Sequence, residues 1–195
     1  RRGGRFGLKQ GYLTSSGATV YAMFGHAETP ALTMPAAYQQ TAKQFGRTFG
    51  GVNPTLFRIF ATAQFDSWLT IGITDGSTTS GLSHMEMDKS KQGFGVWGAD
   101  GSTTSLSVTD GVVYKQPDNG CSARVCTLAQ LTLKADAGKG APKWSANVNL
   151  HGTMAAGKRA AKWEQLAVKF SQSTPTPNTA SKVFLTSKKE RHCGC

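Results

Sequence analysis

A six-residue segment, Asp-Gly-Ser-Thr-Thr-Ser, occurs twice in this chain, at 75–80 and again at 100–105. The Asp-Gly pair is typical of tight turns, because glycine readily adopts the positive φ that such turns need. The first copy follows residues 65–74, where aromatic and β-branched residues predict a strand. Apolar residues lie on both alternating faces at the start of that run, so we expect a central strand of a sheet.

Similar short runs recur along the chain, with glycine-rich turns between them. Glycine accounts for 23 of the 195 residues, and helical periodicity is nearly absent. Many short strands at regular spacing predict an all-β fold, a β-sandwich or jelly roll, in a single domain. The segment between Pro30 and Pro35 is expected to be an edge or a loop, because proline interrupts a ladder of hydrogen bonds. Strands are expected at 19–24, 56–60, 65–74, 94–97, 111–114, 125–133, 144–150 and 163–170, with an edge strand at 182–186 and a short helix within 36–45.

The distribution of charge separates a body from two basic ends. The formal net charge is +11; the first ten residues carry four positive charges, and the last fourteen carry four positive and one negative. We expect a basic Gly/Arg arm at 1–16, a β-sandwich domain at 17–172, and a proline-containing linker with a basic, cysteine-bearing tail at 173–195. Extended basic arms favour an anionic partner, such as an acidic protein surface. The residues expected to meet it are Arg1, Arg2, Arg5, Lys9, Lys182, Lys188, Lys189 and Arg191.

The four cysteines are Cys121, Cys126, Cys193 and Cys195. Cys193 and Cys195 are too close in sequence for an easy mutual bridge. Cys121 and Cys126 can close a small loop, or the tail can be stapled to that loop. His192 beside the tail thiols also suggests zinc, but the spacing matches no common zinc pattern, so we expect no metal. At least one disulfide is expected, which would place the protein outside the reducing cytosol.

The start of the chain and its apolar content bear on location. No apolar run approaches the length of a membrane span. The chain begins at Arg1 and shows no apolar signal-peptide core, so we expect either a processed chain or a fragment. The expected location is extracellular, at a cell surface, or in an organelle lumen such as that of a thylakoid.

Catalytic spacings are missing from the sequence. The histidines show neither His-x-His nor His-Glu-x-x-His spacing, and there is no Gly-x-Ser-x-Gly segment. We therefore expect a protein that is not an enzyme and has no cofactor, unless His84 or His151 converges with acidic residues in a pocket. Core positions are expected for Trp68 and Trp97. Trp144 and Trp163 flank basic loops and are the candidates for stacking on a ligand.

Several segments in a fixed order carry a resemblance to a known family, and together they span about residues 17–171. The most specific are Asp-Ser-Trp-Leu-Thr-Ile-Gly at 66–72, Ala-Gln-Leu-Thr-Leu at 129–133 and Asn-Leu-His-Gly at 149–152. The body resembles an extracytoplasmic β-sandwich domain of secreted and surface proteins of bacteria and algae. The resemblance implies a location outside the cytoplasm and supplies no catalytic residues. The basic arms and the cysteines depart from the family pattern.

Together these features predict a non-enzymatic structural or accessory subunit. It would dock through its sandwich and basic arms onto protein subunits of a larger extracytoplasmic or lumenal assembly. The alternative is a secreted module that binds carbohydrate or matrix through Trp144 and Trp163. A less favoured alternative is a jelly-roll capsid protein whose arginine-rich N-terminal arm binds nucleic acid.

Overall fold

The computed structural model describes most of the body of the chain and a few short segments near its ends. Of the basic residues predicted to contact a partner, only Arg5 lies within the described residues. The predictions for Arg1, Arg2, Lys9, Lys182, Lys188, Lys189, Arg191, Cys193 and Cys195 lie outside them. The described residues are 5–6, 11–12, 18–40, 48–73, 75–77, 81–86, 93–98, 104–122, 125–133, 143–156, 159–171 and 185–186.

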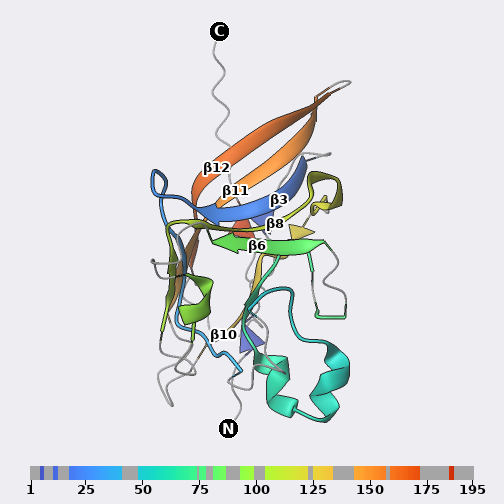
Figure 1. Cartoon of the computed structure of the whole chain (residues 1–195), viewed down its shortest axis with the longest axis vertical. Coiled ribbons are helices and arrows are strands. Elements are labelled where there is room, and N and C mark those ends of the chain that lie inside the picture. The colour runs from blue at the N-terminus through green and yellow to red at the C-terminus, as the bar shows by residue number, and fades with distance from the viewer. Residues whose placement is uncertain are drawn as a thin grey trace.

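The described part of the chain forms an all-β fold, which confirms the predicted class. Its main feature is a seven-stranded antiparallel sheet, in which five strands lie side by side in the upper half of Figure 1. In spatial order these are β6 (Leu82–Glu86), β8 (Gly111–Lys115), β3 (Ala18–Gly25), β11 (Ser145–Ala156) and β12 (Arg159–Ser171).

Of the other two strands of this sheet, one pairs with β11 beyond the end of β3, and the second pairs with the first. β11 pairs with β3 from Asn149 to Met154 and with β4 (Leu32–Met34) at Asn147. β4 also pairs with β7 (Leu106–Val108), so it has a neighbour on each side. The expectation of an edge or loop there was wrong, because Pro30 and Pro35 flank β4 and remove no N–H from its ladder.

Two three-stranded sheets complete the fold. One has the order β1 (Arg5–Phe6), β10 (Ala129–Thr132) and β5 (Trp68–Leu69). The other has the order β13 (Leu185–Thr186), β2 (Gly11–Tyr12) and β9 (Val125–Cys126), with β13 parallel to β2. The edge strand expected at 182–186 is therefore found in part, as β13.

One hydrophobic core joins the large sheet to the sheet of β1, β10 and β5. Met23, Val113 and Val148 enter it from the large sheet, and Leu69 and Leu131 enter it from the smaller one. Such packing of two sheets through one core is the arrangement of a sandwich. Trp97 is also a member of this core, and Trp68 is buried as well, so the burial predicted for both tryptophans is confirmed.

Two of the expected strands were wrong and a third is found only in part, because the local residues favour 3-10 turns. The run 56–60 lies mostly in a 3-10 helix, η1 (Pro54–Arg58), where the side chain of Asn53 accepts a hydrogen bond from the Thr55 N–H. The run 94–97 forms another, η3 (Phe94–Val96). In 65–74 only β5 is extended, since η2 (Ala61–Phe65) enters it and a positive φ at Gly72 bends the chain after it.

A turn is present at the first Asp-Gly, at 75–77, but Gly76 does not adopt the positive φ on which the prediction relied. The Asp75 carboxylate accepts hydrogen bonds from the hydroxyl and the N–H of Ser77. These bonds to Ser77 lower the pKa of Asp75 below its usual range. The second copy of the segment lies mostly outside the described residues.

Candidate functional site

The face of the large sheet that points away from the core carries aromatic, aliphatic and charged side chains. Neighbours in register share a face, and the row through His151 of β11 includes Tyr114 of β8 and Glu164 of β12. The next row contains Met85, Val112 and Phe24. We call this cluster the outer-face patch: Tyr21, Phe24, Met85, Val112, Tyr114, His151, Glu164 and Leu166.

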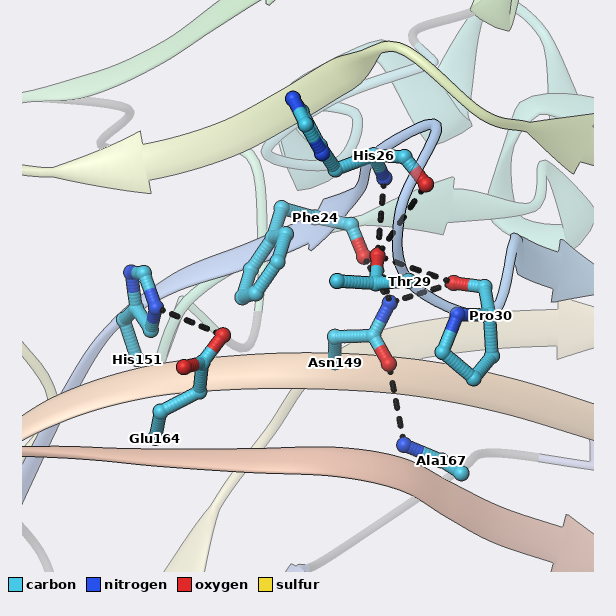
Figure 2. Close-up of polar contacts among 8 residues, drawn as sticks. All are labelled: Phe24, His26, Thr29, Pro30, Asn149, His151, Glu164 and Ala167. Carbon is cyan, nitrogen blue, oxygen red and sulfur yellow. Dashed lines mark hydrogen bonds and ion pairs between the residues drawn. The ribbon is translucent and has the colours of Figure 1, made fainter.

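A histidine–glutamate contact lies within the patch and is an ion pair when the imidazole is protonated. His151 Nε2 is 3.2 Å from Glu164 Oε1, with 40% and 46% of the two side chains exposed. The Phe24 ring packs against the imidazole at a centroid distance of 4.5 Å, and the Tyr21 ring lies at 6.3 Å. Figure 2 shows His151 and Phe24 together, with Glu164 reaching toward the imidazole from β12. An exposed pair of this kind adds less than about 1 kcal/mol to stability.

Asn149 supports the patch from within the sheet. Its side chain is fully buried. Nδ2 donates to the carbonyls of Phe24 at 3.0 Å and Pro30 at 2.6 Å and lies 3.3 Å from Thr29 Oγ1, while Oδ1 accepts from the Ala167 N–H at 2.9 Å. In Figure 2 the amide lies between the loop after β3 and strand β12. One side chain therefore fixes three segments on which patch residues depend.

A β-bulge in β12 faces Asn149. Val148 pairs with Val168 and Leu150 pairs with Gln165, so two residues of β12 lie opposite one residue of β11. Ala167, in the bulge, has a φ of 55°. The bulge leaves its other residue, Leu166, 44% exposed on the patch.

We expect Ala167→Gly to leave stability within about 0.5 kcal/mol of the wild type. An alanine in the left-handed region is strained by roughly 1 kcal/mol, and glycine removes this strain. The gain offsets the larger conformational entropy that glycine loses on folding. The control is Ala161→Gly, an exposed position in the regular part of β12, which should lose roughly 0.5–1 kcal/mol. Urea denaturation of both variants gives the comparison. Equal losses would mean that Ala167 carries no strain.

Two histidines were named as conditions for an enzyme. The structure places His84 against Phe49, with ring centroids 4.0 Å apart, and edge-on to Phe94. His151 does meet an acid, Glu164, and both side chains are part-exposed on the outer face of the sheet. The expectation that the protein is not an enzyme stays a prediction. Sequence reasoning missed Phe24 and Glu164 as its neighbours, because their proximity depends on strand register.

The predicted stacking tryptophans take part in core packing. Trp144 belongs to the buried core and is 9% exposed. Trp163 packs against the core beside Gly152, and its Nε1 donates to the Thr153 carbonyl at 3.2 Å. Burial of Trp144 argues against the stacking role expected of it, whereas Trp163 is half-buried, so its stacking role stays a prediction.

A wide, shallow groove of about 600 Å³ runs beside Trp144. Hydroxyl groups, one lysine and several apolar side chains line it. Among the described residues, the buried Trp144 indole N–H has no hydrogen-bond partner. The lining residues are Thr33, Met34, Pro35, Ser105, Leu106, Ser107, Lys143, Trp144 and Ser145.

Two further features, a metal-binding cluster and a membrane-spanning helix, are absent from the described part of the chain. Across the described ranges, no three His, Cys, Asp or Glu side chains gather closely enough to hold a metal ion. Within those ranges, too, no helix has the length and apolar character to cross a membrane. The zinc alternative involves His192 and the tail cysteines, which lie outside the described residues.

Comparison with known proteins adds no relative. No family model, curated protein sequence or solved structure matches this chain. The resemblance to an extracytoplasmic sandwich family therefore stays a prediction.

Proposed function

We propose that this chain is a non-catalytic accessory subunit that docks onto a protein partner through its outer-face patch. The observation that carries the proposal is the part-exposed cluster of Phe24, Tyr21 and His151 with Glu164, bordered by exposed Leu166 and Met85. Protein interfaces are enriched in aromatic residues and methionine at their centres, with polar groups that fix the register of the partner.

The patch is also held in place before any partner binds. Its strands are fixed by the β3–β11–β12 ladder, and the buried amide of Asn149 ties the Phe24 carbonyl to β12. A preorganised surface loses less conformational entropy on binding than a mobile one. This supports a docking surface built on rigid strands.

The proposed partner is a protein surface with an apolar centre and a polar group able to meet His151 or Glu164. We favour protein over glycan because Trp144 and Trp163 contribute to the core. The basic arms would add contacts to acidic regions of the same assembly, outside the reducing cytosol. Binding of nucleic acid by the N-terminal arm stays a separate prediction.

Two substitutions on the patch test the proposal: Leu166→Asp on β12 and Met85→Asp on β6. Each puts a charge where an apolar contact is proposed. We therefore expect the affinity for the partner to fall at least tenfold, which corresponds to about 1.4 kcal/mol of binding free energy. The matched control is Ile59→Asp, which changes an exposed apolar residue that is 71% exposed in the turn after η1. The measurement is quantitative mass spectrometry of proteins cross-linked to the tagged full chain in its native source.

The expected pattern is one protein lost with both patch variants and kept with Ile59→Asp. Thermal melting of the purified variants checks that all three remain folded. A partner kept by both patch variants, or a wild-type chain that stays monomeric and alone at low salt, would contradict the proposal. Recovery of a glycan in place of a protein would favour the groove beside Trp144 as the binding site.

A further inference from the structure

Cys121 and Cys126 meet where three parts of the fold come together. Cys121 forms an antiparallel bridge with Val20 of β3, with N···O distances of 2.7 and 3.0 Å between their backbones. Cys126 lies in β9 and is buried. The chain after β5 reaches the same place, since the Gly72 N–H donates to the Thr127 carbonyl at 2.8 Å. The two thiols are thus held by segments that are already fixed.

Gly72 brings the two cysteines together, since its N–H donates a hydrogen bond to the residue after Cys126 and its α-carbon faces the Cys121 side chain. A hydrogen bond to Cys121 and burial raise the pKa of the Cys126 thiol, while Lys115 and the Gly72 N–H act in the opposite direction. Both cysteines carry reduced thiols in the structure.

Gly72 leaves room for the sulfur atoms. A Cβ at this position would lie 2.9 Å from Cys121 Cβ and 3.0 Å from Cys121 Sγ, and the φ of Gly72 is 75°. The residue is therefore required both by its left-handed backbone and by the neighbouring thiol. Cys121 is partly exposed, whereas Cys126 is buried.

We propose that Cys121 and Cys126 are a redox-active pair that closes into an intramolecular disulfide across residues 122–125. With a small-molecule disulfide such as oxidised glutathione as the oxidant, the Cys121 thiolate attacks one of its sulfurs and releases one glutathione thiolate. The Cys126 thiolate then attacks Cys121 Sγ and releases the second glutathione. The two protein thiols lose two protons and two electrons, and the electrons leave on two molecules of reduced glutathione.

The pairing can be read from tryptic peptides, because trypsin cuts after Arg124, between the two cysteines. Residues 116–124 contain Cys121, residues 125–134 contain Cys126, and residues 192–195 contain both tail cysteines. The full chain is equilibrated with reduced and oxidised glutathione, alkylated, digested without reduction and analysed by mass spectrometry. We expect 116–124 linked to 125–134 at oxidising poise and both peptides alkylated at reducing poise.

Variants separate this pair from the tail. Cys193→Ser/Cys195→Ser should keep the linked peptides, whereas Cys126→Ser should abolish them. In the tail variant, oxidation should raise the melting temperature by about 5 °C, because the disulfide constrains the unfolded chain. A link from either body peptide to 192–195 would overturn the proposal. So would thiols that stay alkylatable at oxidising poise, or that react only after a zinc chelator is added.

Discussion

Replacing Asn149 with alanine is expected to lower the free energy of unfolding by about 4 kcal/mol. The substitution removes the partner of the Phe24 carbonyl, the Pro30 carbonyl and the Ala167 N–H in one step. The Asn149 side chain itself is fully buried. A polar group left unpaired in such a place costs roughly 1–3 kcal/mol. Urea denaturation in reducing buffer measures the loss.

Asn147 offers a matched control on the same face of the same strand. Its Nδ2 donates to the Ala31 carbonyl at 2.8 Å, while its Oδ1 is buried without a partner. Because alanine at 147 removes one bond and one unpaired acceptor together, we expect a loss of about 1 kcal/mol or less. Similar losses at the two positions would show that Asn149 is one polar contact among many, and that the loop and the β12 bulge hold without it.

If Asn149 has the predicted weight, its loss also reaches the outer-face patch. The amide joins the Phe24 carbonyl to the bulge that carries Leu166, so two patch residues depend on it through their backbones. Stability and docking would then fail together in Asn149→Ala. The surface variants Leu166→Asp and Met85→Asp should instead weaken docking and leave stability near that of the wild type.

The strands of the large sheet were predictable where β-branched and aromatic residues alternate. The runs at 19–24, 111–114 and 163–170 fall within β3, β8 and β12, and 144–150 falls within β11 except for its first residue. Their side chains have one buried and one exposed face, and this period of two is the clearest signal a strand leaves in a sequence.

The sequence patterns failed to predict other elements for two physical reasons. Apolar residues at successive positions, as in 65–74, indicate a segment that is buried on all sides. Short strands and tightly packed turns can both be buried in this way, so the pattern does not distinguish them. Conversely, β6 reads Leu-Ser-His-Met-Glu and is largely exposed, so little hydrophobic pattern marks it as a strand. It is held in the sheet by its pairing with β8.

The candidate site was even less visible in the sequence. The pairing of His151 with Glu164 depends on the register of β11 with β12, which includes a bulge. Asn149 had one usable signal, since asparagine is depleted in strands and a strand that keeps one often needs its side chain. The proximity of Cys121 and Cys126 was among the predicted options, because five positions of sequence separation allow a small loop.

The second large effect is expected at Gly152, the β11 residue that follows His151. A Cβ there would lie 2.1 Å from the Trp163 ring and 2.2 Å from the Thr19 carbonyl oxygen. No left-handed backbone is involved, so the cost of Gly152→Ala is steric. Because one obstacle is backbone and the other a large ring, strands β3 and β12 must both move, and we expect a loss of about 3 kcal/mol.

Gly95→Ala is the control, since a Cβ at that position meets nothing within 4 Å. It should change stability by less than about 0.5 kcal/mol. Trp163→Leu separates the two obstacles at Gly152: if the ring alone resists the methyl group, Gly152→Ala should become nearly harmless in that background. We expect most of the loss to remain, because the Thr19 carbonyl is still in place. Full recovery of stability would instead mean that the Trp163 ring is what holds β3 close to β11.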